Sequence, residues 1–387
     1  MFTLSPIQKK VLDEIIDWQK KTSEFSFITL GGYAGTGKTT LIGHLRNTLH
    51  KEKKDLKVAF VCYTGKAARV LRNSLRTEKA LYEKDTVGTI HSLIYSPIVN
   101  EKEEIIGWQR KKKIDQDLII VDEASMVDEY IWRDICSYEK PIIAVGDHGQ
   151  LPPIRGNFNL MAKPMLTLTE IHRQAKGNPI IQVSILAREL GEIPFGDYGT
   201  QVKKLSKKDS DSQDIISELL NSYTPETLIL CGYNATRVKL NGHIRKMLGF
   251  EFPSPTAGDR VICLRNNHEK NVFNGMLGTV NSVHPKTDAW YKAEIAMDDE
   301  EDPFRGLIAQ AQFNAPGALN FTENRSLILE SDLFDFGYAI TVHKAQGSQA
   351  PRVILFEERF SRMDDEMWRR WLYTAVTRAQ EELFIIG

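Results

Sequence analysis

Short, nearly continuous apolar runs recur along the first half of the chain and alternate with segments of helical periodicity. The runs cover residues 26–30, 57–62, 117–121 and 141–145. Runs of this length without polar alternation are typical of parallel strands that are covered on both faces. Helical patterns fill residues 6–20, 38–50, 65–77 and 127–138. This order predicts a doubly wound α/β domain.

Strand-like runs return in the second half of the chain. They cover residues 227–231, 336–342, 352–356 and 382–386, and helical patterns fill residues 234–248 and 366–379. We therefore expect a second α/β domain. Residues 191–225 show the least regular pattern, and we interpret them as the connection between the two domains.

Two segments break the alternation of strands and helices. Residues 94–113 predict a polar-tipped hairpin that turns near Asn100 to Glu103. Residues 258–332 carry strand-like pieces separated by Gly, Asn and Asp, which favours a small antiparallel β insertion. We interpret the acidic run at 298–302 inside it as a solvated turn rather than a metal site.

Composition narrows the class of protein. A single core stops growing at roughly 250–300 residues, so 387 residues predict at least two domains. The 50 Lys and Arg against 51 Asp and Glu exclude a protein held to nucleic acid by bulk positive charge. The 4 cysteines are far apart, which argues against a zinc site or a disulfide framework. No apolar run approaches the ~18 residues that would span a bilayer, so we expect a soluble intracellular protein.

Residues 32–39 read Gly-Tyr-Ala-Gly-Thr-Gly-Lys-Thr and match the pattern G-x-x-x-x-G-K-[ST]. They follow a predicted strand and open a predicted helix, which is the context that a P-loop requires. The glycines let backbone N–H groups curl around an anion, and the helix start adds partial positive charge. Lys38 would reach the β- and γ-phosphates, and the Thr39 hydroxyl would bind Mg²⁺. The sequence therefore predicts a nucleoside triphosphate site.

Two adjacent carboxylates, Asp122 and Glu123, come directly after a buried run. In a P-loop NTPase the first would hold Mg²⁺ and the second would orient and deprotonate the attacking water. Alone, they would be two solvated carboxylates at a helix start. Together with the P-loop they predict ATP or GTP hydrolysis.

Further polar segments indicate how the phosphates would be sensed. Asp147 and Gln150 follow the fourth run, where a polar side chain can detect the γ-phosphate. The second domain has no P-loop of its own, but it could supply arginines to a nucleotide bound by the first. Arg173 and Arg378 are the candidates, because arginine stabilises the charge of a phosphoryl group in transfer. Taken singly, either would be a surface or salt-bridge residue.

The ordered set of motifs resembles superfamily 1 DNA helicases, specifically the RecD-like branch that includes the phage Dda helicases. The set reads GYAGTGKTT, YTGKAAR, TIHSL, VDEAS, GDHGQLPP, HRQ, HKAQGS and YTAVTRA. The resemblance implies an α/β fold of two RecA-like P-loop NTPase domains with a β-hairpin insertion (1B) and an SH3-like β insertion (2B). It also implies an ATP-dependent DNA helicase that moves 5′→3′ on single strands. The polarity rests on the resemblance alone.

The resemblance also implies a domain layout. Domain 1A would comprise residues 1–93 and 114–168, and the duplex-splitting 1B hairpin would comprise residues 94–113. Domain 2A would comprise residues 169–257 and 333–387, and 2B would comprise residues 258–332. Because the chain ends just after YTAVTRA, we expect no further C-terminal domain.

Matching positions imply the residues of the ATP site. The catalytic positions are Lys38, Asp122, Glu123, Gln150, Arg173 and Arg378. The nucleotide-binding positions are Gln8, Gly35, Thr36, Gly37, Lys38, Thr39, Thr40, Gln346 and Gly347, and Thr39 and Asp122 would hold Mg²⁺. Gln8 would read the adenine edge, which favours ATP. The family often carries glutamate where this chain has Gln349, so a ribose contact by that residue is open.

The implied single-strand contacts are Thr64, Lys66, Thr89, His91, Thr341 and His343. Hydroxyls, a lysine and imidazoles at loop ends can bind phosphates without reading sequence. Without the resemblance, a structural role would be favoured for His91. Trp108 and the basic residues 110–113 would either add stacking and charge near DNA or form a solvated edge.

The expected partners are single-stranded and forked duplex DNA, together with single-strand-binding or replication proteins. We expect a monomer in the cytoplasm of a bacterium or a phage-infected cell. Three rival functions are a translocase that strips proteins from DNA, a degenerate motor that only coats single strands, and a P-loop small-molecule phosphotransferase. The last leaves the motifs after residue 145 unexplained.

Overall fold

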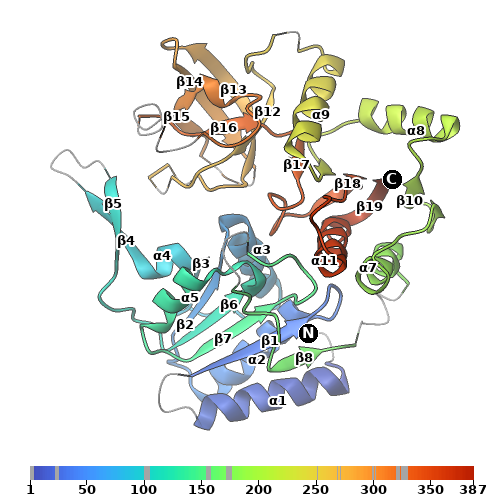
Figure 1. Cartoon of the computed structure of the whole chain (residues 1–387). Coiled ribbons are helices and arrows are strands. Elements are labelled where there is room, and N and C mark those ends of the chain that lie inside the picture. Colours follow the sequence, from blue (N-terminus) through green and yellow to red (C-terminus); the bar gives the residue numbers. More distant parts are fainter. Residues whose placement is uncertain are drawn as a thin grey trace. The chain divides into compact units, whose positions relative to one another are not determined.

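The chain divides into two compact units, Met1–Gln182 and Val183–Gly387 (Figure 1). The computed structural model describes residues 4–21, 26–99, 105–153, 158–170, 177–250, 252–267, 269–270, 272–298, 300, 302–319, 323 and 330–387. In this part of the chain, no helix is long and apolar enough to cross a membrane.

A parallel sheet forms the centre of the first unit. Its strands are β1 (Phe27–Gly32), β2 (Val58–Cys62), β3 (Thr86–Thr89), β6 (Leu118–Asp122), β7 (Ile142–Gly146) and β8 (Leu166–Leu168), in the order β3-β2-β6-β7-β1-β8. The helices are α1 (Pro6–Lys21), α2 (Lys38–Glu52), α3 (Gly65–Thr77), α4 (Ile90–Ile94), α5 (Glu129–Cys136) and the 3-10 turn η1 (Ala124–Met126).

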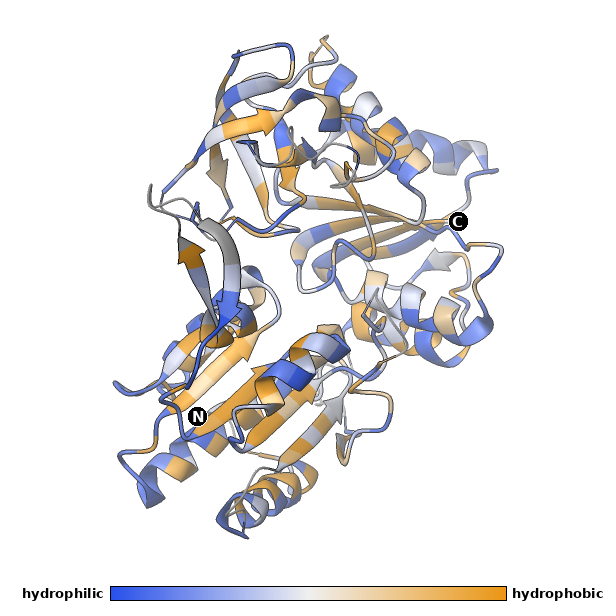
Figure 2. Ribbon diagram, turned by 60° about the vertical axis from the view of Figure 1, so that its left-hand side comes forward, coloured by the Kyte–Doolittle hydropathy of each residue, from blue (hydrophilic) through white to orange (hydrophobic). Residues whose placement is uncertain are grey.

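Both faces of this sheet are buried, as the continuous apolar runs predict. Val58 and Phe60 of β2 pack into a core with α1, α2 and α3. Ala59 and Val61, which alternate with them, pack into a second core with α4 and α5 on the opposite face. Figure 2 shows the hydrophobic strands of the sheet against the mixed surfaces of the helices. The predicted α/β architecture of the first half is confirmed.

The predicted hairpin is present as β4 (Tyr95–Val99) and β5 (Ile105–Arg110), paired antiparallel. The turn predicted near Asn100 to Glu103 lies outside the described residues. The base of the hairpin is anchored beside α5. The Tyr138 hydroxyl lies 2.8 Å from the carbonyl oxygens of both Ile94 and Lys111. These contacts fix the two arms where they leave the sheet domain.

The second unit has a six-stranded sheet within its described residues, and only β9 runs antiparallel to its neighbour. Its strands are β9 (Gly196–Asp197), β10 (Val202–Leu205), β11 (Thr227–Cys231), β17 (Ala339–Thr341), β18 (Ala350–Phe356) and β19 (Ala379–Ile386), in the order β17-β11-β18-β19-β10-β9. The helices are α7 (Pro179–Glu189, across the unit boundary), α8 (Ser210–Asn221), α9 (Asn234–Met247) and α11 (Asp365–Val376). Helices α8 and α9 share one core with the sheet, and α11 packs on β18 and β19.

An antiparallel sheet interrupts this unit, in agreement with the predicted insertion. It is formed by β12 (Arg260–Cys263), β13 (Leu277–Pro285), β14 (Trp290–Met297), β15 (Phe304–Ala309) and β16 (Phe334–Phe336), with the 3-10 turn η2 (Gln310–Gln312) after β15. The order is β15-β14-β13-β12-β16, and the sheet encloses a small core of its own. Asp298, in the acidic run interpreted as a solvated turn, forms an ion pair with buried Arg260. Asp299 and Glu301 of that run lie outside the described residues.

The predicted strand at 336–342 is wrong as a single element. Phe334–Phe336 pairs with β12 in the small sheet, whereas Ala339–Thr341 pairs with β11 in the large one. The chain changes sheets at Gly337, where an added Cβ would lie 2.7 Å from the carbonyl carbon of Val261. Only glycine allows this close approach, so the apolar run is shared between two sheets.

Residues 191–225, interpreted as the connection between the two domains, instead lie within the second unit. They contain β10, paired with β19 inside the large sheet, and α8. The β10 sequence Val-Lys-Lys-Leu contains two lysines, so it lacks the apolar run that would predict a buried strand. Lys204 is 7% exposed, and its ammonium lies 2.5 Å from a carboxylate oxygen of Glu357.

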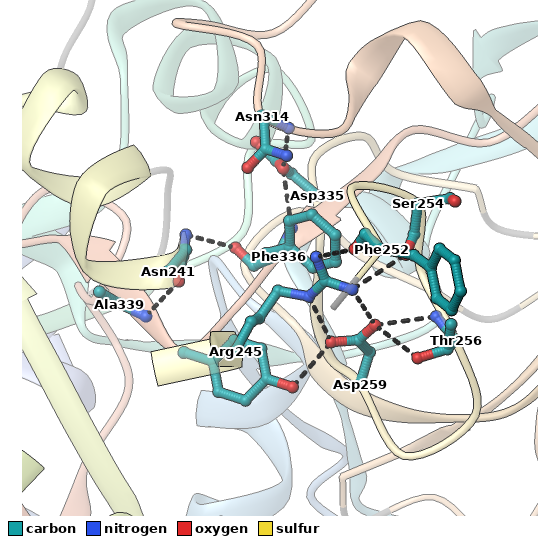
Figure 3. A network of polar contacts seen from close by, with 11 residues as sticks. Asn241, Arg245, Phe252, Ser254, Thr256, Asp259, Asn314, Asp335, Phe336 and Ala339 are labelled. Carbon is teal, nitrogen blue, oxygen red and sulfur yellow. Dashed lines mark hydrogen bonds and ion pairs between the residues drawn. The ribbon is translucent and has the colours of Figure 1, made fainter. Parts of the chain in front are cut away.

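One face of α9 fastens the insertion to the large sheet (Figure 3). Arg237, Asn241 and Arg245 follow at four-residue spacing and therefore share that face. Arg237 pairs with Asp335 of β16 at 2.6 Å. Asn241 accepts from the backbone N–H of Ala339 at 2.7 Å and donates to the Phe336 carbonyl at 3.1 Å.

Arg245 fixes the other crossing, just before β12. Its Nε and Nη2 donate to the two carboxylate oxygens of Asp259 at 2.8 and 2.9 Å. It also donates to the carbonyls of Phe252 and Ser254, and its guanidinium lies 4.0 Å from the ring centre of Phe336. One helix thus holds both chain crossings between the large sheet and the insertion.

Candidate functional site

The P-loop is shaped by its own backbone. Gly35 and Gly37 adopt φ of 79° and 77°, a left-handed conformation that side chains rarely tolerate. The Lys38 ammonium donates to the carbonyls of Gly32 and Tyr33 at 2.8 and 3.1 Å. The N-cap residue of α2 is Gly37, which has no side chain to bond the first N–H groups of the helix, and such N–H groups are suited to bind an anion. The loop therefore has the cation and the donors that a triphosphate requires.

Gln8 connects α1 to this loop. Its side-chain Nε2 donates to the Thr36 carbonyl at 3.0 Å, and its Oε1 accepts from the Ser5 backbone N–H at 3.0 Å. The Thr36 hydroxyl donates back to the Tyr33 carbonyl at 2.8 Å. Gln8, which is predicted to read the adenine edge, thus holds the phosphate-binding loop through the Thr36 carbonyl.

Thr40 is oriented differently from the rest of the predicted phosphate cradle. Its hydroxyl donates to the carboxyl of Glu78, at the end of α3. Gly43, one turn further along α2, makes room for this carboxyl, because an added Cβ would lie 2.0 Å from its Oε2. Burial raises the pKa of Glu78, and the Thr40 bond partly opposes that shift. The hydroxyl of Thr40 therefore helps to join α2 to α3.

Asp122 and Glu123 lie at the carboxyl end of β6. Burial, and then the charge of Glu123, raise the pKa of the Asp122 carboxyl, while the Glu123 N–H at 3.0 Å and Lys38 oppose the shift. Glu123 has a left-handed φ of 53°, which costs a non-glycine residue about 1–2 kcal/mol. Strain of this kind concentrates at functional sites.

Four predicted motifs meet at one edge of the sheet, because the carboxyl ends of parallel strands share that edge. The P-loop follows β1, Thr64 follows β2, Asp122 ends β6 and Asp147 follows β7. Asp147 is 1% exposed; its carboxylate accepts from the Gly149 N–H at 2.9 Å and, at 3.5 Å, from the Gln150 amide. The structure thus brings the candidate γ-phosphate sensor and the P-loop to the same edge.

The donor set at this edge suits Mg²⁺. A P-loop magnesium takes one or two protein oxygens, and its other ligands are phosphate oxygens and water. Thr39 can supply a hydroxyl, and Asp122 can supply a carboxylate whose pKa is raised by burial and by the charge of Glu123. Among the described residues no cluster of three or more His, Cys, Asp or Glu forms a self-sufficient metal site. A cation here would need the nucleotide.

The candidate DNA hydroxyls of the first unit begin helices. Thr64 accepts from the Ala67 N–H and caps α3, and Thr89 accepts from the Ser92 N–H and caps α4. Each hydroxyl acts as the acceptor in its cap, so its hydrogen is not used in that bond. Lys66 lies in the first turn of α3, beside Thr64.

The candidate histidines His91 and His343 are partly buried. The His91 ring lies 5.6 Å from that of Tyr95 and 6.2 Å from that of Tyr63, measured between centroids. Burial lowers the pKa of both His91 and His343. Both imidazoles are thus neutral at pH 7, so they would act as hydrogen-bonding groups and not as cations.

The motifs of the second unit form one compact group. The Arg378 guanidinium donates to the carbonyls of Thr374 and Ser348 and to the Thr377 hydroxyl. Ser348 belongs to the same loop as Gln346, which is 6% exposed, and Gly347, which has a φ of 74°. Thr341 ends β17 just before this loop, and Gln349 accepts from the Gln380 amide at 3.3 Å. Arg173, the other candidate finger, lies outside the described residues.

Sequence reasoning missed Glu358 in this unit. Its Oε2 accepts from the backbone N–H groups of Gly232 and Tyr233 at 2.9 and 3.1 Å, and its Oε1 accepts from the Thr236 hydroxyl at 2.6 Å. This carboxylate fills the start of α9, which follows β11 as the P-loop helix α2 follows β1. The partners are about 120 positions apart in sequence, and no local pattern reveals the contact.

Trp108 and the basic run 110–113 divide between exposed and structural positions. Trp108 is 41% exposed on β5. Arg110 donates to the Ser137 hydroxyl at 2.7 Å, and Lys111 donates to the Ser92 carbonyl at 2.8 Å. Lys112 and Lys113 are exposed. The run therefore partly holds the hairpin base.

Comparison with known families assigns both halves of the chain. Residues 16–155 match the AAA domain family, and residues 336–386 match the UvrD-like helicase C-terminal domain family. The ATP-dependent RecD2 DNA helicase of Deinococcus radiodurans is 27% identical, over 99% of this chain and 49% of the relative. The RecD subunit of the RecBCD enzyme of Buchnera aphidicola subsp. Schizaphis graminum is 24% identical, over 94% of this chain and 70% of that relative. The chain thus spans about half of the first relative's length.

Solved structures share the fold. A Bacteroides Pif1 helicase, crystallised with ADP-AlF3 and ssDNA, aligns with a TM-score of 0.56 at 19% identity, over 100% of this chain and 92% of the other. The Pif1 helicase of Candida albicans aligns with a TM-score of 0.51 at 16% identity, over 100% and 95% of the two chains.

The two sheets, one with a P-loop and carboxylates at its carboxyl edge, have the architecture of RecA-like cores with antiparallel insertions. The chain is similar to RecD-type helicases over nearly its whole length, and it shares the fold of Pif1 helicases. The resemblance predicted from the motifs is confirmed.

Proposed function

We propose that the chain is an ATP-dependent DNA helicase that moves 5′→3′ along single strands and unwinds duplex. The observation that carries the proposal is the meeting of P-loop, carboxylates and strand-contact motifs at one edge of the first sheet. The relatives named for ATP-dependent helicase activity support it. ATP would be hydrolysed between the two RecA-like lobes, with the second supplying Arg173 and Arg378.

Each part of the site has a chemical task. The Lys38 ammonium and the first N–H groups of α2 bind the phosphates, and Gln8 holds the loop in place. Glu123 orients and deprotonates the attacking water, and Gln150 senses the γ-phosphate. When bound through Thr39 and Asp122, Mg²⁺ would neutralise charge on the phosphates. Arginine fingers are typically worth 10³–10⁵ in rate.

The DNA-facing parts fit the same activity. The capping hydroxyls of Thr64 and Thr89 donate to phosphates in the first lobe, and Thr341 and His343 provide the contacts in the second. The hairpin 94–113 would act as the 1B pin that splits duplex, and its anchored base suits a wedge that must resist the strand. The insertion at 258–332 would be the SH3-like 2B module.

We place the protein as a monomer in the cytoplasm of a bacterium or phage-infected cell, acting on single-stranded and forked DNA with single-strand-binding or replication proteins. The support is the bacterial origin of the relatives and the forked dsDNA in a structure of two Pif1 helicases.

The test is ATPase activity with and without single-stranded DNA, together with unwinding of forks that carry a 5′ or a 3′ tail. We expect stimulation by single strands and unwinding of the 5′-tailed substrate. Lys38→Ala and Glu123→Gln should lose hydrolysis while keeping single-strand binding. Absence of stimulation would refute the helicase proposal, and unwinding of only the 3′-tailed fork would refute the polarity.

A further inference from the structure

A pocket of about 270 Å³ opens beside the edge strand β3 in the first unit. It is lined by β3, by the start of α4 and by the segment 111–116, which leads from the hairpin back to β6. None of the ATP-site residues lines it. A pocket just below the ~300–1,000 Å³ range of drug-sized ligand sites suits a smaller group, such as a single base with part of its sugar.

Part of the pocket lining is apolar. Val61, Val87, Leu93 and Ile114 line the pocket, and Val61 and Ile114 are also part of the buried core. Such walls can pack against the two faces of a flat ring.

The rim carries groups that match the edges of a base. Thr86 is exposed there, and Gln116 donates to its hydroxyl over a long 3.5 Å contact, so both retain hydrogen-bonding capacity. Asp115, also exposed, is an acceptor for a ring N–H or an exocyclic amino group. A carboxylate at the rim would repel a phosphate placed inside the pocket.

Positive charge lies on one side of the opening. Lys111 is held there by its bond to the Ser92 carbonyl at 2.8 Å, and Lys113, two residues on, is exposed. Both line the pocket. They can hold a backbone phosphate outside while a base lies inside. Thr89, a candidate strand contact, lies in the same lining.

We propose that this pocket receives one nucleobase of the bound single strand, with Lys111 and Lys113 holding the adjoining phosphate. The inference rests on the proposed function, because it requires a single strand near Thr89. It adds a contact to a base beside the phosphate contacts proposed for Thr64, Lys66 and Thr89 in the same lobe. A base that leaves the stack here would resist sliding of the strand.

The test measures affinity for oligo(dT) and for an abasic oligomer of equal length, by fluorescence anisotropy. Thr86→Trp fills the pocket from its exposed rim with a residue that strands favour. It should weaken oligo(dT) binding about tenfold, the loss typical of one removed base contact, and leave the abasic oligomer within about twofold. Thermal unfolding establishes that the variant is folded.

A pair of lysine variants tests the phosphate contact without disturbing the core. Lys113→Gln should weaken binding of both oligomers and reduce the salt dependence by about 0.7 in the log–log slope. The matched control is Lys112→Gln, an exposed neighbour that does not line the pocket, and it should change the slope less.

Equal weakening of both oligomers by Thr86→Trp, or no weakening, would overturn base insertion. Equal effects of the two lysine variants would overturn the phosphate contact. In both cases DNA-stimulated ATPase persists, so the proposed function stands. If the wild-type chain binds neither oligomer and shows no stimulation, the proposed function itself fails.

Discussion

Replacing Asp259 by asparagine should destabilise the second unit more than any surface charge substitution. Asp259 is fully buried, and Arg245 is 5% exposed. The substitution preserves shape but removes the only carboxylate that the Arg245 guanidinium contacts among the described residues. The guanidinium keeps its bonds to two carbonyls, which carry no compensating charge.

The magnitude follows from this geometry. Leaving one partner of a buried ion pair uncompensated typically costs 3–5 kcal/mol. The Tyr338 hydroxyl and the Thr256 N–H, each 2.8 Å from an Asp259 oxygen, would lose a charged acceptor as well. We therefore expect a loss of about 4 kcal/mol in the free energy of unfolding of this unit. With a urea m-value of about 2–3 kcal/mol per M, the midpoint should fall by about 1.5 M.

Urea titration combined with hydrogen exchange is the suitable assay, because a chain of two units need not unfold in one step. Amides of α9, β12 and β16 should lose protection together, while those of β1 and β7 in the first unit should not. Glu294→Gln is the matched control. It breaks the Arg305 pair on the same insertion, where the Arg305 and Glu294 side chains are 67% and 34% exposed, and should shift the urea midpoint far less, because solvent screens an exposed pair. If Asp259→Asn shifts the midpoint no more than this control, the reasoning is refuted.

Three further predictions concern the candidate site. Gln8→Ala removes the hydrogen bond to the Thr36 carbonyl and should raise the KM for ATP about tenfold. Leaving a buried acceptor without its donor typically costs about 1–3 kcal/mol. An unchanged KM would contradict a supporting role for Gln8. Thr64→Ala should cost about 1 kcal/mol through the lost α3 cap and should weaken single-strand binding, whereas Thr64→Ser should restore both, in denaturation and anisotropy measurements. Burial lowers the pKa of His343. Below about pH 6.5 the unfolded chain therefore binds a proton that the folded chain resists. The free energy of unfolding should thus decrease as the pH is lowered. His343→Gln should reduce that fall between pH 7 and 5, measured by denaturation at each pH.

The elements that sequence reasoning located share one property, namely that their local pattern agrees with their final environment. The strands β1, β2, β6 and β7 are apolar throughout because both faces of the sheet are covered. The P-loop is recognisable because the backbone conformation of Gly35 and Gly37 is a local requirement. The lobe fold and the phosphate loop could therefore be predicted in advance.

The elements that were missed depend on distant partners. Strand β3, with the sequence Thr-Val-Gly-Thr, is short and lies at the sheet edge, so it carries no apolar run. Strand β10 tolerates a buried Lys204 only because Glu357, far along the chain, neutralises it. The Arg245–Asp259 network likewise becomes visible only when α9 and β12 are in place (Figure 3). No single-chain pattern encodes such pairings.

The carboxylate of Glu358 at the start of α9 has a consequence for competition between ligands. It belongs to the chain, so its effective concentration at the Gly232 and Tyr233 amides is that of an intramolecular group, typically in the millimolar range or above. A free phosphate compound would have to displace this tethered anion. The strand–loop–helix unit at β1 is the proposed nucleotide site, whereas two N–H groups at its counterpart after β11 already bond a carboxylate of the chain. The same strand–loop–helix arrangement therefore serves as the proposed nucleotide site in the first unit and as an internal contact in the second.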